Sequence, residues 1–128
     1  MLNCCSFEYD MRQFLKSFVQ ACNGFPLMFK EKNFTIHIGA AFTAIFLCIF
    51  LQVSTIEFLI VVVCIATVIS AEIFNSAVEK LCDFVHPEEH EQIKVIKDIA
   101  AAAVLMVALA SFIVGVVIFV PKLVDLFF

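Results

Sequence analysis

Three long apolar segments follow one another along this chain. Residues 34–53 contain no Asp, Glu, Lys or Arg, residues 56–81 include a charge-free stretch from Phe58 to Ala71, and residues 98–120 contain a third apolar run. A helix of about 20 apolar residues is long enough to cross the hydrocarbon core of a bilayer. The pattern therefore predicts three transmembrane helices, over about residues 34–53, 56–81 and 98–120.

The first thirty residues show a different pattern, in which basic and aromatic side chains are interleaved. Phe14 and Phe18 lie one helical turn apart with a lysine between them, so a helix here has an apolar side and a basic side. Helices of this kind lie in the plane of the membrane interface. We expect a surface helix over about residues 6–30, with a break at Gly24 and Pro26.

The composition agrees with a membrane protein. Hydrophobic residues make up 63% of the 128 positions and the mean hydropathy is +1.07, which is more apolar surface than a soluble domain of this size can bury. Residues 1–128 are expected to form a single integral-membrane domain. The net charge is −4 and the chain has no basic stripe, which argues against nucleic acid as a partner.

Basic residues indicate the orientation in the membrane. Four Lys or Arg residues precede the first span, and Lys80, Lys94 and Lys97 flank the connection between the second and third spans, whereas the connection between the first two spans has none. Lys and Arg concentrate in cytoplasmic loops. The amino terminus and the polar loop after the second span are therefore predicted to be cytoplasmic.

The second span changes character towards its end without any turn signal. Glu72 is followed by Asn75, Glu79 and Asp83, at offsets of three, seven and eleven residues. At about 100° per residue, these four side chains fall on one narrow stripe of an α-helix. Carboxylates at the edge of the hydrocarbon are costly and usually functional. The stripe is the first candidate for a site.

The residue types in this stripe favour phosphate chemistry. Carboxylates with lysines nearby can hold Mg²⁺ together with an anionic phosphate ligand. A carboxylate partly immersed in hydrocarbon is also suited to act as a general base. The chain has only three glycines, which excludes a Gly-rich phosphate loop. The sequence thus indicates phosphoryl transfer to a membrane molecule. The alternative is a non-catalytic membrane protein, such as a transporter subunit, that uses the stripe for ion passage or helix association.

Three segments carry a recognisable sequence pattern. They read Glu31-Lys32-Asn33-Phe34-Thr35-Ile36-His37, then Glu72-Ile-Phe-Asn75-Ser76-Ala77-Val78-Glu79 continuing through Asp83 and His90 to Lys97-Asp98, and finally Gly115-Val-Val-Ile-Phe119-Val-Pro121-Lys122. In order and spacing, the chain resembles the prokaryotic diacylglycerol kinase family, which includes the undecaprenol kinases.

The resemblance implies an architecture and an activity. It implies an all-α membrane protein of three spans and a surface helix, assembled as a homotrimer in the bacterial inner membrane with active sites shared between neighbours. It also implies ATP as phosphate donor, Mg²⁺ as cofactor and a membrane lipid alcohol as acceptor. The acceptor is undecaprenol or diacylglycerol, and residues 33–37 together with the ending at Lys122 look closer to the undecaprenol branch.

The resemblance also implies roles for individual residues. Glu72 corresponds to the base that takes the proton from the lipid hydroxyl, with Asn75 beside it, and Glu31 and Glu79 correspond to the metal ligands. The implied nucleotide-binding residues are Arg12, Glu31, Glu79, Glu88, His90, Lys97 and Asp98. Two departures from the family pattern lie upstream: Gln20 stands where an aromatic residue is common, and Pro26 interrupts a segment that is usually helical.

Overall fold

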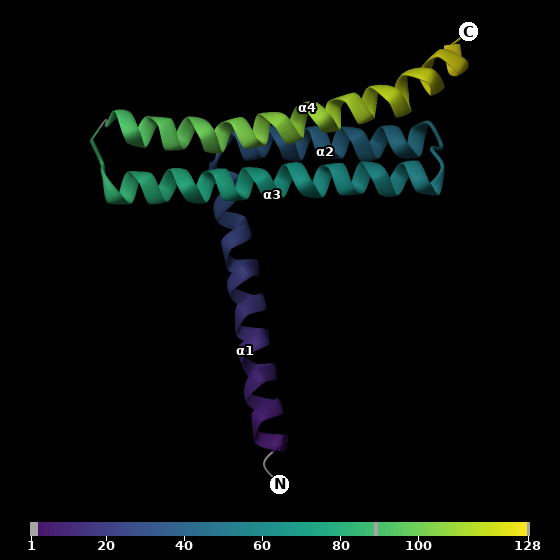
Figure 1. The fold of residues 1–128 in the computed structure, drawn as a ribbon. Coiled ribbons are helices and arrows are strands. Elements are labelled where there is room, and N and C mark those ends of the chain that lie inside the picture. The colour runs from purple at the N-terminus through teal and green to yellow at the C-terminus, as the bar shows by residue number, and fades with distance from the viewer. Residues whose placement is uncertain (1–2, 89, 128) are drawn as a thin grey trace.

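The fold is taken from a computed structural model of the chain, which describes the backbone of residues 3–88 and 90–127 and the side chains of residues 11–88 and 90–127. Within these ranges every regular element is a helix (Figure 1). The elements are α1 (Asn3–Gly24), the 3₁₀ helix η1 (Phe25–Lys30), α2 (Lys32–Phe50), α3 (Thr55–Val85) and α4 (Glu91–Phe127).

Helices α2, α3 and α4 lie side by side and form a bundle (Figure 1). Each is long and apolar enough to cross a membrane. Large apolar side chains on their outer surfaces are exposed, among them Phe42, Phe46 and Leu105. A continuous apolar exterior of this kind is stable only against lipid. The chain is an all-α membrane protein with three spans and an amino-terminal helix.

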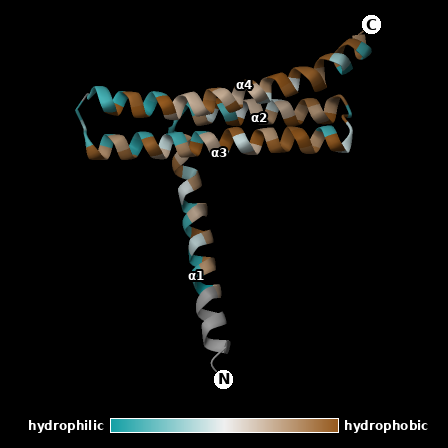
Figure 2. Cartoon of the chain, viewed as in Figure 1, coloured by the Kyte–Doolittle hydropathy of each residue, from teal (hydrophilic) through white to brown (hydrophobic). Residues whose placement is uncertain are grey.

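The two ends of the bundle differ in polarity. Figure 2 shows hydrophobic residues along most of α2, α3 and α4, and hydrophilic residues where α3 ends and α4 begins. We call this end, which carries the connection from His86 to His90, the polar end; the other end carries the turn from Leu51 to Ser54. Figure 1 shows α3 and α4 extending past the start of α2 at the polar end.

Helix α1 projects from the bundle at a steep angle (Figure 1). It ends at Gly24, and the 3₁₀ helix that follows has Pro26 in its first turn, where the missing N–H of proline costs nothing. Phe25, Phe29 and Phe34 then pack edge to face, with ring centroids 5.4–6.0 Å apart. Phe34 is completely buried. This aromatic cluster fixes the end of the amino-terminal segment against the start of α2.

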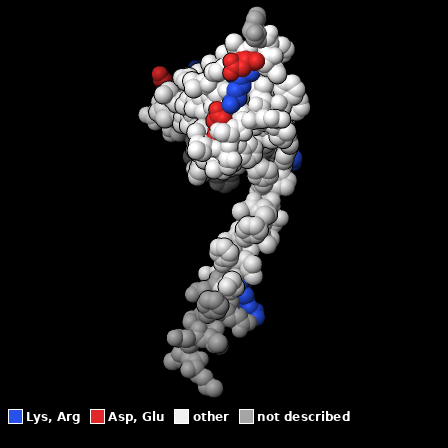
Figure 3. All heavy atoms as spheres, turned by 90° about the vertical axis from the view of Figure 1, so that its right-hand side faces the viewer, with Lys and Arg blue, Asp and Glu red and all other residues white. Residues whose placement is uncertain are grey.

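The turn between α2 and α3 is built by a capping box. The Ser54 hydroxyl accepts a hydrogen bond from the backbone N–H of Glu57 at 3.3 Å, and the Glu57 carboxylate accepts one from the backbone N–H of Ser54 at 2.7 Å. Lys122 of α4 lies 3.3 Å from the same carboxylate oxygen of Glu57. Figure 3, which looks onto this end, shows acidic and basic side chains in contact on a largely uncharged surface. The contact joins α4 to the start of α3.

Two of the helix ends that differ from the sequence-based expectation lie near a proline. The third span was expected to close at Pro121, but α4 continues through this proline to Phe127. A proline removes one backbone hydrogen bond, and α4 keeps its helical path and bends away from its neighbours (Figure 1). The second span was expected to end near Leu81, but α3 reaches Val85. It stops there because the residue before Pro87 cannot remain helical without a clash.

Candidate active site

The acidic stripe of α3 divides into a buried and a more exposed part. Glu72 is 3% exposed, Asn75 5% and the neighbouring Ser76 3%. Glu79, two turns beyond Glu72, is only half-buried, and Asp83 is exposed. The stripe therefore runs from the interior of the bundle to its polar end, as the helical spacing of these residues requires.

Asn75 links the two parts of the stripe. Its Nδ2 donates a hydrogen bond to Oε1 of Glu79 at 2.9 Å. Its Oδ1 is buried and has no hydrogen-bond partner among the described residues. Buried polar atoms without a partner are uncommon in proteins and often mark functional sites. The carboxamide thus orients one carboxylate and leaves a free acceptor oxygen beside it.

Glu31 reaches the stripe from another element. It lies between η1 and α2 in an extended conformation, where its backbone N–H donates to the carbonyl of Met28 at 2.9 Å and its carbonyl accepts from Thr35. Its carboxylate forms an ion pair with Lys80 of α3. The start of α2 and the polar half of α3 are therefore joined through charged side chains.

Among the described residues, His37, Glu79 and Glu31 are the charged groups near enough to Glu72 to interact electrostatically with its carboxylate. The structure thus gathers three carboxylates, one imidazole and the Asn75 carboxamide from α3 and the start of α2. Glu72 lies on the inner side of this group, and Glu31 and Glu79 lie on the side that water reaches. A reactant held by the bundle could meet Glu72 while a water-soluble one approached Glu31 and Glu79.

A second ion pair lies further towards the polar end. Lys97 of α4 pairs with Asp83 of α3. Asp83 does not pair with Lys80 of its own helix, because Lys80 is directed to Glu31 and α4 brings Lys97 alongside α3. Asp98, the next residue on α4, is exposed.

The connection between α3 and α4 carries two further candidates, Glu88 and His90, and both are exposed. His86 stacks at a tilt against His90, with ring centroids 5.3 Å apart, and its Nδ1 lies 3.0 Å from the carbonyl oxygen of Glu88. Glu89, which belongs to the same expected nucleotide-binding loop, lies outside the described residues.

Arg12, an expected nucleotide-binding residue, lies away from the carboxylate group of its own protomer. It lies in α1, twelve residues before Gly24, which corresponds to about 18 Å of helix. Figure 1 shows α1 pointing away from the bundle. Within one protomer, Arg12 is therefore not part of the carboxylate site.

The oxygen atoms of this site suit Mg²⁺ bound together with phosphate. No three or more His, Cys, Asp and Glu side chains among the described residues form a complete metal site. Magnesium bound to a nucleotide needs only one or two carboxylates, because phosphate and water oxygens complete its shell. Glu31, Glu79 and the unpaired Oδ1 of Asn75 supply hard oxygen donors of the required type.

Three features of the site were not expected from the sequence. They are the pairing of Lys80 with Glu31, the position of His37 beside Glu72 and the burial of Ser76. Helical spacing places His37 in the second turn of α2, and Glu31 directly precedes this helix, but spacing does not say which helix faces them. The first two features depend on how α2 packs on α3, which spacing within one helix does not encode.

A membrane bundle with a carboxylate cluster between its apolar interior and its polar end has groups suited to phosphoryl transfer at a membrane surface. The sequence profile described as prokaryotic diacylglycerol kinase matches residues 19–119. The chain belongs to this family, and it is a lipid kinase. Family membership favours the enzyme over a non-catalytic membrane protein.

Two relatives have closely related activities in their names. The chain is 39% identical to the undecaprenol kinase of Bacillus subtilis over 116 residues, which cover 89% of this chain and 94% of that protein. It is 33% identical to the diacylglycerol kinase of a Synechocystis species over 114 residues, which cover 88% of this chain and 65% of that protein. No solved structure matches the chain.

Proposed function

We propose that this protein transfers the γ-phosphate of ATP to undecaprenol, at the cytoplasmic face of the bacterial inner membrane. The observation that carries the proposal is the layering of the site, with Glu72 buried towards the bundle and Glu31 and Glu79 partly open to water. The preference for undecaprenol over diacylglycerol is supported by the Bacillus subtilis relative, which matches at higher identity and over nearly its whole length.

The reaction follows from the positions of these residues. The lipid hydroxyl oxygen attacks the γ-phosphorus, the bond from that phosphorus to the bridging oxygen breaks, and ADP leaves. Glu72 accepts the hydroxyl proton, and Asn75 positions the reacting groups beside it. Glu31 and Glu79 hold Mg²⁺, which when bound neutralises charge on the phosphate oxygens.

The remaining candidates act on the nucleotide. Glu88 and His90 lie on the exposed connection at the polar end, and Lys97 and Asp98 lie at the start of α4 beside it. Lys97 offers a cation to the triphosphate once it is released from Asp83. These four residues border the partly exposed side of the carboxylate group, from which a water-soluble nucleotide approaches.

The active assembly in this proposal is a homotrimer with its amino terminus in the cytoplasm. The position of Arg12 supports sharing of sites, because α1 carries it away from the carboxylates of its own protomer. A neighbouring protomer is then the place where its guanidinium reaches a bound nucleotide. The basic residues at the polar end support the orientation.

The decisive experiment offers the purified protein both lipids. Protein reconstituted into vesicles receives ³²P-labelled ATP, Mg²⁺ and either undecaprenol or diacylglycerol, and labelled lipid is separated by chromatography. We expect undecaprenyl phosphate to form at least about tenfold faster. Equal or higher rates with diacylglycerol would show that the acceptor has been misassigned, and a lack of labelled lipid with either would reject the reaction itself.

A further inference from the structure

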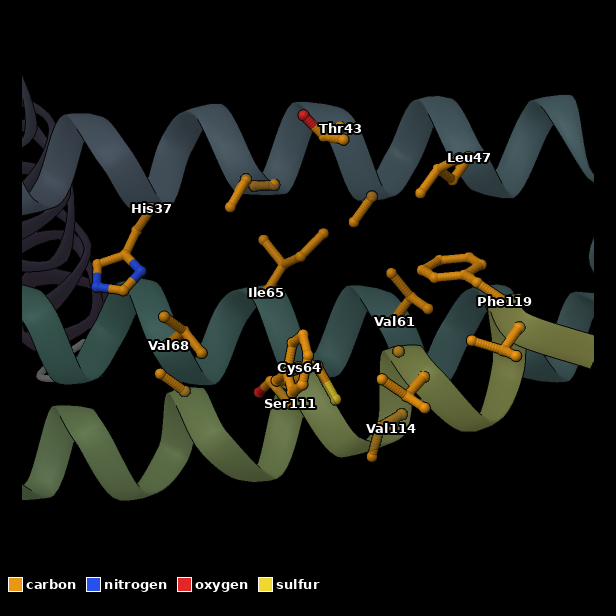
Figure 4. A pocket seen from close by; sticks show the side chains of 18 residues that line it. His37, Thr43, Leu47, Val61, Cys64, Ile65, Val68, Ser111, Val114 and Phe119 are labelled. Atoms are coloured by element: carbon orange, nitrogen blue, oxygen red, sulfur yellow. The ribbon is translucent and has the colours of Figure 1, made fainter. Parts of the chain in front are cut away.

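A long groove runs between α2, α3 and α4, in the part of the bundle that crosses the membrane. It has a volume of about 590 Å³, within the usual range for sites that bind small molecules. Figure 4 shows the side chains that line it, with His37 near one end and Phe119 near the other. Apart from His37, Thr43 and Ser111, the residues that line it are apolar or small.

The groove begins beside the carboxylate group. Figure 4 shows the His37 ring directed from α2 towards α3, close to Val68. Val68 precedes Glu72 by one helical turn, and His37 is one of the groups whose charge acts on the Glu72 carboxylate. The proposed base therefore lies immediately beyond the end of the groove that His37 marks.

The groove is elongated along the helices. Its wall on α2 extends from His37 to Leu47, which is about 15 Å of the roughly 28 Å length of this helix. At the far end Phe119 packs on the cluster formed by Cys48, Val61 and Ile118. The groove thus passes the middle of α2 and ends against a packed core.

Small side chains create this space. Ala40, Ala41 and Ala44 line the α2 wall, and Gly115 lies on α4 in the opposite wall. The Thr43 hydroxyl donates to the carbonyl of Gly39 at 3.0 Å, so it adds no free donor to the groove. Such a lining favours hydrocarbon and offers no path for an ion.

We propose that this groove holds the part of the acceptor's hydrocarbon chain nearest the hydroxyl, as a single file of isoprenoid units, with the terminal hydroxyl delivered past His37 to Glu72. The inference rests on the proposed function and names the subsite that selects the acceptor. A single groove accommodates one chain. It therefore fits a lipid alcohol with one hydrocarbon chain better than a glycerolipid with two acyl chains. The groove's continuity with the carboxylate group argues for the acceptor's own chain rather than bulk lipid or a helix of another protomer.

Two glycines provide a matched pair of variants. Gly115 lines the groove, and a Cβ there would meet only the Phe119 side chain at 3.8 Å; a Cβ at Gly39 would meet nothing within 4 Å, and Gly39 does not line the groove. Both glycines lie inside apolar helices, so Gly115→Leu and Gly39→Leu change helix propensity equally. Only Gly115→Leu places a side chain in the groove.

We expect Gly115→Leu to lower kcat/KM for undecaprenol by at least about tenfold. A side chain that fills part of an apolar subsite lowers kcat/KM for a substrate that needs this space by about this factor. The KM for ATP should stay unchanged, the defect should shrink with a short isoprenoid alcohol such as geraniol, and Gly39→Leu should behave as wild type.

If Gly115→Leu does not fold, Ala41→Leu on the opposite wall serves the same purpose. Wild-type kinetics with undecaprenol in a folded groove variant would overturn the inference while leaving the lipid kinase activity intact. A wild-type protein that phosphorylates no polyprenol would instead reject the proposed function.

A photoreactive polyprenol locates the chain directly. An analogue with a diazirine a few carbons from the hydroxyl is irradiated with the wild-type protein, and labelled peptides are mapped by mass spectrometry. Labels on groove residues such as Ala41, Cys64 and Val114, displaced by undecaprenol, support the proposal. Labels confined to outward-facing Phe46 and Val117 would overturn it. Cross-links between protomers across the groove without lipid labelling would do the same, because they would assign the groove to a second copy of the chain.

Discussion

Asn75 donates a hydrogen bond from Nδ2 to Oε1 of Glu79, one turn further along α3, while its own Oδ1 stays buried without a partner among the described residues. The contact orients the Glu79 carboxylate and aligns two oxygen donors on one side of the helix. Glu72, one turn before Asn75, is more deeply buried than Glu79. In the proposed reaction, the inner carboxylate serves proton transfer and the outer oxygens serve metal and phosphate.

Substitution of Glu72 by Gln should remove most turnover. The side chain keeps its size and loses its ability to accept a proton, so we expect kcat to fall by about 10²–10⁴-fold while the protein still folds and binds MgATP. Initial rates with undecaprenol and labelled ATP measure the effect. Glu91→Gln is the matched control, because this exposed carboxylate lies in the first turn of α4 outside the carboxylate group. A Glu72→Gln rate within twofold of wild type would reject the base assignment.

Glu79→Ala should change the magnesium requirement. In the proposed site Glu79 is a metal ligand, so its loss should raise the Mg²⁺ concentration that gives half-maximal activity by about tenfold or more, which is about 1.4 kcal/mol. Asn75→Ala should shift the same titration in the same direction by a smaller factor, because it removes the hydrogen bond that orients Glu79. Rates measured across a magnesium titration test both variants. If the magnesium titration curve of Glu79→Ala matches that of the wild type, the metal assignment is wrong.

Mixed assemblies test whether sites are shared. Arg12→Ala and Glu72→Gln should each be nearly inactive alone. If Arg12 acts on a neighbour's nucleotide, co-assembly of the two variants creates some sites with both residues intact, and activity should return to a fraction of the wild-type level. The measurement is the initial rate of the assemblies formed from a mixed, denatured and refolded population. Mixtures no more active than the separate variants would place Arg12 within its own protomer's site or outside the chemistry.

Ser54→Ala should lower stability without affecting the chemistry. Ser54 caps α3, and loss of such a cap costs about 1 kcal/mol. We expect the thermal unfolding midpoint in detergent to fall by a few degrees, with the magnesium dependence unchanged. Ser17→Ala is the control, because the Ser17 hydroxyl donates only to the carbonyl of Gln13 within exposed α1. Equal midpoints for Ser54→Ala and Ser17→Ala would show that the cap does not stabilise the bundle.

The helices could be predicted from the sequence because each depends on local pattern. Apolar runs long enough to span a bilayer, the Ser54 cap and the stop before Pro87 are all encoded by neighbouring residues. The continuation of α4 through Pro121 was not predicted. A proline ends a helix only when the lost hydrogen bond outweighs the contacts made by the following turns. Those turns bring Lys122 to Glu57, a partner 65 residues earlier in the chain.

The sequence by itself determined that this is a three-span membrane protein with an acidic stripe on its second span, because hydropathy and helical periodicity are properties of neighbouring residues. Tertiary structure decided which partners the stripe meets. Lys80 is directed to Glu31, Lys97 to Asp83, and His37 lies beside Glu72. These contacts, and the groove between α2, α3 and α4, arise from how the helices pack on one another. Packing depends on how the surfaces of helices that are far apart in the sequence fit together, and the periodicity within one helix does not determine this fit.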